Sequence, residues 1–373
     1  MKILSIIGTR PQFIKLYPIC KAIRDYNKNT SKKIAHVIVN TGQHFDKLMS
    51  DVFIEELDID FPEYNLGIQE ESQCLQVGKM IVGLEEILLY EKPDIVLVYG
   101  DTNSTLAGAI ATKKLNFKLA HIEAGLRSFN RSMQEEINRI VTDKISDILF
   151  CPTRNAYENL EDEGFLLEKN KYEVCLVGDV MYDCFLYFKD VALSKSKILK
   201  EIFGKDRRYI LATIHRAENT DHPFRLNKIL ELLDELSDKY FIVFPVHPRT
   251  KKYIKNIGLK RSSKLKMIEP VSYFDMLKLE GNADFIITDS GGVQKEAYFF
   301  NKVCITLRNE TEWIETLEEG CNYLINLDSF DSKTIAENIM NILNGNKGPI
   351  FKENNYGNGS ASKKIIEYLI KQR

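Results

Sequence analysis

Short runs of apolar and β-branched residues alternate with longer amphipathic stretches along most of this chain. Helices are predicted between the short runs, at Ser104–Lys114, Glu136–Ile145, Pro223–Ser237 and Val293–Phe300. The short runs predict strands in two successive series, at Lys2–Ile7, Ala35–Asn40, Ile95–Tyr99, Leu119–Ile122, Ile148–Phe150 and Glu173–Val177, then at Tyr209–Thr213, Phe241–Val246, Leu265–Ile268, Phe285–Thr288 and Cys304–Leu307. This alternation is typical of βαβ units, and it predicts an α/β fold built on parallel sheets.

The two series of βα units indicate two Rossmann-like domains. A length of 373 residues agrees with this, because single hydrophobic cores stop growing at about 250–300 residues. Gly178 ends the first series and the lysine-rich segment Ser194–Arg208 follows, so the join is expected near Val177–Asp183. The last predicted helix, Ala361–Arg373, is expected to return to the first domain. The expected ranges are residues 1–177 for the N-terminal domain, 178–357 for the C-terminal domain and 358–373 for the returning helix.

Composition narrows the class of protein. The hydrophobic fraction of 44% and the charged fraction of 28% are those of a soluble globular protein. A net charge of −2 argues against nucleic acid or a membrane surface as partner, since both require a basic surplus. Met1–Gly8 is too weakly apolar for a signal peptide, and the seven cysteines form no Cys-x-x-Cys pair. A cytoplasmic protein with free thiols is therefore expected.

Candidate chemistry is sought at the carboxyl ends of the predicted strands, where open α/β sheets bind their ligands. Directly after the first strand, Arg10 and Lys15 occupy the start of a helix, where the helix dipole disfavours cations unless an anion is bound. Contact with a phosphate group is one interpretation of both residues. A surface location near a turn is the alternative, and for Lys15 the sequence favours neither.

Carboxylates follow two later strands. Asp101 comes after one strand and Glu123 after the next, so on neighbouring strands they would face one crevice, as acid/base chemistry requires. Helix capping or ion pairing is the alternative for Asp101. Glu135 and Glu136 begin a helix, where acidic residues are favoured in any case, and both have ion-pair spacing to Arg139. For Glu136 the structural interpretation is the stronger one.

The second half offers a basic and a glycine-rich segment. His215 and His247 each follow a strand and lie close to an arginine, as a proton donor or a phosphate partner would. Ser290-Gly291-Gly292 forms a turn that opens a helix, and the amide groups of such a turn bind a diphosphate. Glu296, one helical turn further on, is placed to accept hydrogen bonds from ribose hydroxyls.

Several other chemistries lack their motifs in this sequence. No His-x-x-x-His or H-E-x-x-H pair is found, so no metal site is expected. The chain also has no G-x-S-x-G elbow, G-x-G-x-x-G dinucleotide fingerprint or Walker motif. No cofactor is therefore expected.

Taken together, the motifs resemble the non-hydrolysing UDP-N-acetylglucosamine 2-epimerase family, in order and over nearly the whole chain. The matching segments are GTRPQFIK (8–15), TGQH (41–44), YGDTNST (99–105), HIEAGLR (121–127), EEINR (135–139), CPT (151–153), IHRAEN (214–219), HPR (247–249), DSGGVQKE (289–296) and TEW (311–313). The resemblance implies the glycosyltransferase-B architecture, with a cleft between two Rossmann-like domains, and a homodimer.

The resemblance also implies a reaction and a set of residues. The family inverts carbon 2 of a UDP-sugar by eliminating UDP to a glycal and adding it back, without a cofactor. Carried onto this chain, the acid/base and leaving-group residues are Asp101, Glu123, Glu135 and His215. The UDP-sugar would be bound by Arg10, Lys15, Ser290, Gly291, Gly292, Glu296 and Arg308.

Some features depart from the common family pattern. Gln134 stands where the family usually has proline, in a shortened segment that leaves the choice between Glu135 and Glu136 open. That segment and Glu312-Trp313 are more similar to the branch that acts on UDP-2,3-diacetamido-2,3-dideoxy-glucuronate. Gln43 and His44 resemble part of a second, activating substrate site. The alternatives are a glycosyltransferase of the same fold, a hydrolysing 2-epimerase and a non-catalytic sensor of UDP-sugars.

Overall fold

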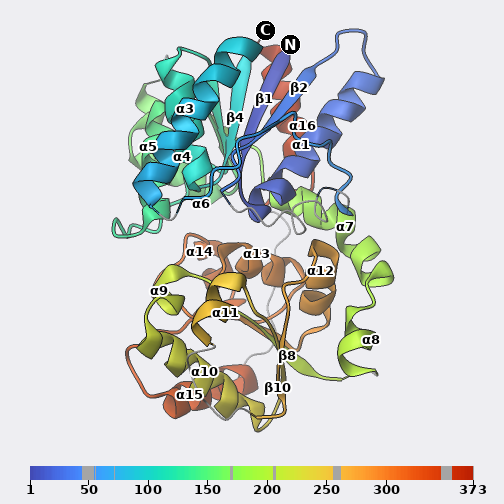
Figure 1. The fold of residues 1–373 in the computed structure, drawn as a ribbon, viewed down its shortest axis with the longest axis vertical. Coiled ribbons are helices and arrows are strands. Elements are labelled where there is room, and N and C mark those ends of the chain that lie inside the picture. Colours follow the sequence, from blue (N-terminus) through green and yellow to red (C-terminus); the bar gives the residue numbers. More distant parts are fainter. Residues whose placement is uncertain are drawn as a thin grey trace. The chain divides into compact units, whose positions relative to one another are not determined.

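A computed structural model describes residues 1–43, 54, 56–70, 72–168, 171–204, 207–254, 262–345 and 355–372. The chain divides into two compact units. Unit 1 is formed by Met1–Tyr187 together with Glu353–Arg373, and unit 2 by Phe188–Lys352. Each unit contains one parallel sheet with helices packed against it (Figure 1). The predicted α/β fold class with two Rossmann-like parts is therefore confirmed.

The sheet of unit 1 has the strand order β3-β2-β1-β4-β5-β6-β7, and every pair is parallel. Its strands are β1 (Lys2–Ile7), β2 (Ala35–Asn40), β3 (Tyr64–Asn65), β4 (Ile95–Tyr99), β5 (Leu119–Ile122), β6 (Ile148–Cys151) and β7 (Glu173–Leu176). Its helical elements are α1 (Arg10–Lys28), α3 (Gln73–Glu91), α4 (Asn103–Lys114), α5 (Gln134–Ile145), α6 (Arg154–Asp162), η1 (Phe165–Leu167) and α16 (Ala361–Lys371), and α7 (Val180–Lys195) leads into unit 2.

The centre of this sheet is apolar on both faces. All five residues of β4 are buried, and β4 pairs with β1 from Ile3↔Ile95 onward. Such continuous β-branched runs are expected in a parallel sheet covered on both sides. Polar side chains are therefore excluded from the middle of β1 and β4, apart from Ser5, and collect at their ends.

Helix α16 completes unit 1 from the far end of the chain. It packs against α1 and buries Ile365, Ile366 and Leu369. Asp183 of α7 accepts hydrogen bonds from the amide nitrogens of Ala361 (3.1 Å) and Ser362 (2.8 Å). This carboxylate satisfies amide groups at the start of α16 that have no acceptor within the helix.

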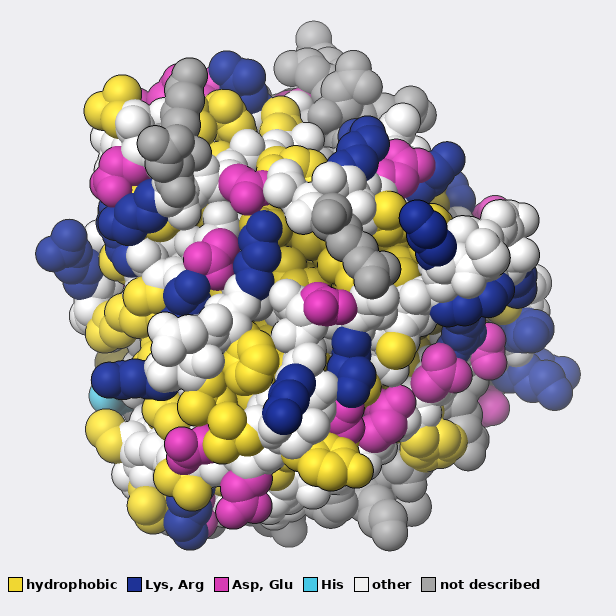
Figure 2. All heavy atoms as spheres, turned by 90° about the horizontal axis from the view of Figure 1, so that it is seen from above, with side chains coloured by type: hydrophobic (Ala, Val, Ile, Leu, Met, Phe, Trp, Pro, Cys, Tyr) yellow, Lys and Arg dark blue, Asp and Glu magenta, His cyan; other side chains and the backbone are white. Residues whose placement is uncertain are grey.

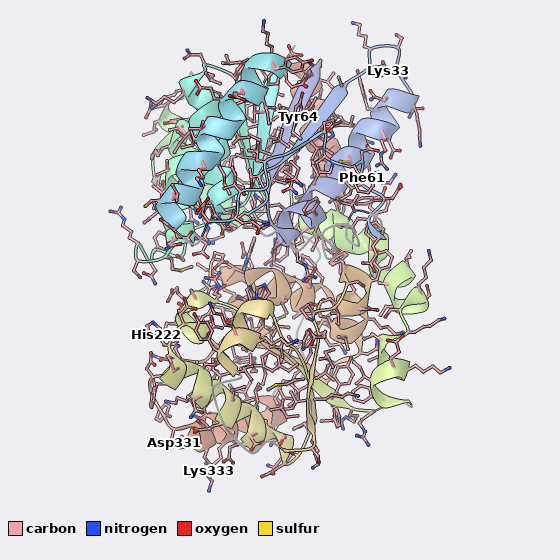
Figure 3. All side chains as sticks on the ribbon, in the orientation of Figure 1. Lys33, Phe61, Tyr64, His222, Asp331 and Lys333 are labelled. Atoms are coloured by element: carbon pink, nitrogen blue, oxygen red, sulfur yellow. The ribbon has the colours of Figure 1, made fainter. Side chains whose placement is uncertain are left out.

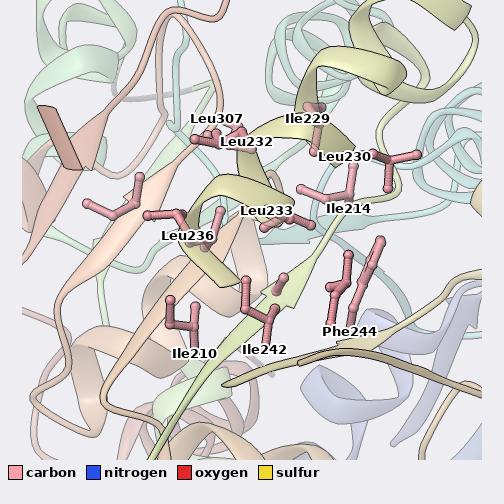
Figure 4. Packing of buried hydrophobic residues seen from close by; sticks show 14 of the residues in the cluster. Ile210, Ile214, Ile229, Leu230, Leu232, Leu233, Leu236, Ile242, Phe244 and Leu307 are labelled. Carbon is pink, nitrogen blue, oxygen red and sulfur yellow. The ribbon is translucent and has the colours of Figure 1, made fainter. Parts of the chain in front are cut away.

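Unit 2 repeats the arrangement with the strand order β10-β9-β8-β11-β12-β13, again with every pair parallel. Its strands are β8 (Tyr209–Thr213), β9 (Phe241–Pro245), β10 (Leu265–Ile268), β11 (Phe285–Thr288), β12 (Cys304–Thr306) and β13 (Asn322–Leu324). Its helices are α8 (Ile198–Phe203), α9 (Ala217–Thr220), α10 (Pro223–Ser237), α11 (Pro248–Ile254), α12 (Tyr273–Asn282), α13 (Gly291–Phe299), α14 (Ile314–Glu318) and α15 (Ser332–Gly345). Figure 4 shows Leu233 of α10 among the strand residues Ile210 and Phe244 in its core.

The strands predicted from apolar runs are present in the structure with bounds that agree to within a residue or two. Two strands were missed, β3 and β13, which are two and three residues long. Both lie at sheet edges. Tyr64 of β3, labelled in Figure 3, donates a hydrogen bond from its hydroxyl to Glu91 Oε1 at 2.5 Å. A strand this short has no periodicity to detect.

The molecular surface carries charges of both signs. On the face drawn in Figure 2, lysine and arginine side chains are intermixed with aspartate and glutamate. Among the described helices, none combines the length and apolar character that crossing a membrane requires.

Candidate functional site

In each unit the strand order reverses beside the first strand, between β1 and β4 in unit 1 and between β8 and β11 in unit 2. Open α/β sheets bind ligands beyond the carboxyl ends of the strands at such a reversal. The segments that follow these four strands contain Arg10, Asp101, His215 and Ser290, all of which the sequence had indicated.

The best-defined feature of the unit 1 end is a buried ion pair. The ammonium group of Lys15, on α1, contacts Glu123 Oε1, and both side chains are almost entirely buried. Gly100 makes room for this pair, because a Cβ atom there would lie 2.7 Å from Lys15 Nζ. Gly100 and Glu123 both have a positive φ, +63° and +76°, which is strained for glutamate. The backbone after β5 therefore holds Glu123 in a costly conformation.

Gln12 joins the start of α1 to the end of β4. Its Oε1 accepts from the amides of Gly8 (2.8 Å) and Thr9 (3.1 Å), and its Nε2 donates to the carbonyl of Tyr99 at 2.9 Å. Arg10, the first residue of α1, is half-buried in this turn. The sequence placed Gln12 within a matching motif but assigned no role to it.

Asp101 is held by a second buried cation. Arg139 donates to Asp101 Oδ2 from Nη2 (2.8 Å) and Nε (3.1 Å), and it also pairs with Glu136 at 2.5 Å. Glu136 further accepts hydrogen bonds from Ser128 and from the amide of Phe129. The predicted ion pair between Glu136 and Arg139 is therefore present, and the Glu136 carboxylate is occupied by structural contacts. Glu135 is only half-buried at the start of α5.

At the unit 2 end, a buried aspartate organises the segment after β8. Asp289 accepts hydrogen bonds from the amides of His215 (3.1 Å) and Arg216 (3.0 Å) and from Asn219 Nδ2 (3.0 Å). His215 Nδ1 lies 3.3 Å from Asp289 Oδ1, while 40% of the His215 side chain stays exposed. The ring of His247 is 5.7 Å away. The sequence had indicated both histidines but not the aspartate that positions the first.

The start of α13 is enclosed by polar side chains. Ser290 is the N-cap, and its Oγ accepts from the amide of Val293 at 3.5 Å. Gly291 permits close packing, because a Cβ atom there would lie 2.6 Å from Glu312 Oε1. Glu312 pairs with Arg308 at 3.0 Å and lies 3.8 Å from Arg216. Arg308 therefore lies beside the start of α13, and only 1% of its side chain is exposed.

Glu296 lies close to a second carboxyl group. Glu280, on α12, is fully buried, and the charge of Glu296 acts on it. Burial, and then the nearby charge of Glu296, raise the pKa of Glu280 well above its usual value. Two such carboxyl groups do not ionise together at low cost, so Glu280 is the neutral member of the pair. Lys295, also buried, lies over the ring of Trp313 at 4.0 Å.

The predicted site residues are divided between the two units. Unit 1 contains Arg10, Lys15, Asp101, Glu123 and Glu135, and unit 2 contains His215, Ser290, Gly291, Gly292, Glu296 and Arg308. Gln43 of the suggested second site accepts hydrogen bonds from the amide and hydroxyl of Ser104, and His44 lies outside the described residues. Within the part of the chain that is described, no cluster of ligand side chains is suited to a metal ion.

Two cavities lie away from these residues. One, of about 340 Å³, is bordered by Lys118, Asp147 and Glu173 at the amino ends of β5, β6 and β7. The other, of about 330 Å³, is bordered by Arg208 and Asp284 at the amino ends of β8 and β11. Both are at the edge opposite to the one where parallel sheets bind ligands, and their charges are paired with one another.

The chain is similar over its whole length to known 2-epimerases of UDP-sugars. Residues 27–370 match the family model described as UDP-N-acetylglucosamine 2-epimerase. The UDP-2,3-diacetamido-2,3-dideoxy-D-glucuronate 2-epimerase of Pseudomonas aeruginosa is 46% identical over 374 residues, covering 100% of both chains. A UDP-N-acetylglucosamine 2-epimerase homolog of Methanococcus maripaludis is 49% identical over 376 residues, covering 99% of both. The structure of Methanocaldococcus jannaschii UDP-GlcNAc 2-epimerase in complex with UDP-GlcNAc and UDP is 42% identical, with a TM-score of 0.89 and 100% of both chains covered.

Proposed function

The chain belongs to the UDP-N-acetylglucosamine 2-epimerase family, and we propose that it inverts carbon 2 of a UDP-2-acetamido sugar by eliminating UDP and adding it back. It is an isomerase. Its substrate is UDP-N-acetylglucosamine, which gives UDP-N-acetylmannosamine, or the 2,3-diacetamido glucuronate derivative of the same sugar nucleotide. The observation that carries the proposal is the pair of carboxylates after β4 and β5, each bound to a buried cation.

The first half-reaction requires a base. A carboxylate takes the proton from carbon 2 while the bond between carbon 1 and the UDP oxygen breaks, leaving a glycal with a double bond between the two carbons. In the second half-reaction a proton reaches carbon 2 from the opposite face and the UDP oxygen returns to carbon 1. Inversion therefore needs two acid/base groups, and we assign Asp101 and Glu123 to them, with Glu135 as a third candidate. Lys15 and Arg139 compensate the charge of the two carboxylates.

Unit 2 supplies the groups that we assign to UDP. The amides at Ser290, Gly291 and Gly292 begin a nine-residue helix and suit a diphosphate. His215 is held by Asp289 with an exposed ring, and it is positioned to meet charge that develops on the departing phosphate. Glu296, with one oxygen near Glu280, accepts from the ribose hydroxyls. Arg308 acts through Glu312. Arg10 and Lys15, from unit 1, complete the groups assigned to UDP. The proposal requires the acid/base carboxylates and the UDP-binding groups to act on one substrate molecule.

We also infer that the protein forms a homodimer through α3. The outer side of this helix exposes Leu75, Val82 and Leu89 at seven-residue spacing, with Tyr90 beside them, and between 49% and 78% of each side chain is accessible. Two copies of such a stripe bury each other in a twofold contact.

All seven cysteines are free thiols, in keeping with a cytoplasmic location. There the enzyme would supply sugar nucleotides for polysaccharide biosynthesis.

Proton exchange at carbon 2 provides the decisive test. The protein is incubated in heavy water with UDP-N-acetylglucosamine, or with UDP-2,3-diacetamido-2,3-dideoxy-glucuronate, and the products are followed by proton NMR. We expect epimerised product with deuterium at carbon 2, formed without added metal or nicotinamide. Inverted product that keeps its original proton would exclude the elimination mechanism. Release of UDP only when an acceptor is added would indicate a glycosyltransferase, and release of free N-acetylmannosamine would indicate a hydrolysing epimerase.

A further inference from the structure

A histidine on β5, two residues before Glu123, has no role in the proposed reaction. His121, on β5, is fully buried. Its Nδ1 lies 2.7 Å from Asp143 Oδ1, and its Nε2 lies 2.7 Å from the carbonyl oxygen of Gly100. Each ring nitrogen therefore faces an oxygen atom.

The identity of these oxygens determines where the hydrogens are. A carbonyl oxygen only accepts, so Nε2 of His121 carries a hydrogen. The other oxygen of Asp143 accepts from Arg127 Nη1 (2.7 Å) and from the amide of Gly125 (3.2 Å). Burial raises the pKa of Asp143, but His121 and Arg127 together hold it below its usual value, so the group is a carboxylate and accepts from Nδ1 as well. Both nitrogens then carry hydrogens, and His121 is an imidazolium.

Arg127, the other charged partner of Asp143, also donates to Glu163 from Nε (2.6 Å) and Nη2 (3.0 Å). The Glu163 side chain is 31% exposed, so solvent screens its charge. Burial and the nearby Asp143 raise the pKa of the Cys151 thiol, so Cys151 adds no charge. The protonation of His121 is therefore set by the two oxygen atoms that face its ring nitrogens.

The network connects the segments that carry the proposed carboxylates. Asp101 follows Gly100, whose carbonyl accepts from His121. Glu123 precedes Gly125 by two residues, and the amide of Gly125 donates to Asp143. The residue pairing of β4 with β5 ends at Tyr99↔Ile122, and backbone hydrogen bonds continue to the amide of Gly100, which donates to the Ile122 carbonyl (2.9 Å), and to the amide of Glu123, which donates to the Phe150 carbonyl (3.1 Å). There the backbone turns through positive φ at Gly100 and Glu123, and the side chains of His121 and Asp143 bind the Gly100 carbonyl and the Gly125 amide in addition.

We infer that His121 is a positioning residue, whose imidazolium is held between Asp143 and the Gly100 carbonyl and so sets the separation of Asp101 and Glu123. The inference rests on the roles proposed above for these two carboxylates. His121 touches neither carboxylate in any described hydrogen bond. It acts by fixing the backbone that carries them.

The protonation state is tested without substrate. Nitrogen NMR of the full-length protein with labelled histidine, at about pH 7.5 where a free histidine is mostly neutral, reports whether each ring nitrogen carries a hydrogen. The signals of His121 are identified by their loss in His121→Gln. We expect both nitrogens to be protonated. A spectrum with one bare nitrogen on His121 would overturn the inference.

The positioning role is tested with Asp143→Asn, which keeps the size of the side chain and removes its charge. Asp147→Asn is the matched control, because Asp147 is an ion-paired carboxylate just before β6 that accepts from Lys113 and from the amide of Leu119. We expect the kcat of Asp143→Asn to fall between about 10- and 100-fold per folded molecule, since small misplacements of catalytic groups have effects of that size. KM and UDP affinity should stay within about twofold, as should every parameter of the control.

The outcomes separate the two proposals. Normal kcat in Asp143→Asn, or an equal loss in the control, would contradict the positioning role. Absence of any exchange at carbon 2 in the unaltered protein would contradict the proposed function, while the NMR result on His121 would still stand. If Asp143→Asn does not fold, the NMR measurement on the unaltered protein decides the protonation state, and His121→Gln, which can still donate to the Gly100 carbonyl, replaces it in the kinetic comparison.

Discussion

At the scale of single residues, Glu123 combines two unfavourable features. Its carboxylate is buried, and its backbone has a left-handed φ of +76°. Lys15 compensates the charge, and the missing side chain of Gly100 leaves room for the pair. Left-handed backbone costs about 1–3 kcal/mol at a non-glycine residue and is concentrated at functional sites. A contribution to fold stability does not explain a glutamate at position 123, whereas the proton transfer proposed for Glu123 does.

Neutral isosteres of the two carboxylates separate chemistry from folding. Asp101→Asn and Glu123→Gln keep side-chain size but cannot accept a proton, so we expect turnover to fall by about 100-fold or more in each. UDP affinity, measured by calorimetry, should change little, because neither carboxylate is among the groups assigned to UDP and most of those groups lie in unit 2. Glu173→Gln is the control, an ion-paired carboxylate at the start of β7. A variant with near-normal turnover but a clearly lower unfolding temperature would make that carboxylate structural.

The sequence located these carboxylates because each directly follows an apolar strand, and parallel strands end at a common edge. It did not reveal their partners. Lys15 and Glu123 are 108 residues apart, and no local pattern connects them. Asp289 was missed as a positioning group for His215, since an aspartate after a strand has several ordinary uses. Only the strand order brings it against the segment after β8.

At the scale of elements, the contact between α12 and α13 holds two carboxyl groups together. Glu280 is fully buried, and its raised pKa means that the folded protein favours its neutral form. The folded pKa lies above the unfolded value, so the stabilising contribution is complete below about pH 4.5 and is lost as pH rises. Asp143, whose pKa is lowered, has the opposite dependence.

Glu280→Gln should therefore change how stability depends on pH. The variant cannot ionise at this position, so its free energy of unfolding relative to the unaltered protein should rise as the pH is raised above about 4.5, by up to about 1.4 kcal/mol per pH unit. Urea unfolding at several pH values measures this difference. A constant difference across those pH values would show that Glu280 ionises in the folded state as it does in the unfolded chain.

Element boundaries were predicted well where the chain is apolar and less well where side chains define them. The helix at α13 was expected from Val293 but begins at Gly291. Glycine has a low helix propensity, and this argued for a later start. The Ser290 cap and the packing of Glu312 against Gly291 outweigh that propensity, and both depend on tertiary structure.

At the scale of the whole molecule, the α3 stripe predicts the oligomeric state. Val82→Glu places a charge in the middle of the proposed contact, at a position that is 65% exposed in the single chain. We expect weaker dimerisation by about 100-fold or more, because an unpaired charge would be buried. Light scattering combined with size-exclusion chromatography measures this. Leu167→Glu is the control, since Leu167 is more exposed and lies on η1. Unchanged dimerisation of Val82→Glu would place the contact elsewhere, and a monomeric unaltered protein would contradict the proposed dimer.

The path of the chain through the two units has a consequence for how the protein is made. Unit 1 begins the chain but is closed by α16, which covers α1 and is capped by Asp183. As residues emerge from the ribosome, all of unit 2 appears before α16 does. The apolar face that receives Ile365, Ile366 and Leu369 is therefore exposed throughout the synthesis of about 170 residues, while unit 2 is already free to fold. A nascent chain is thus vulnerable to aggregation at unit 1, and a chaperone that protects it would act on α1 rather than on the newest segment.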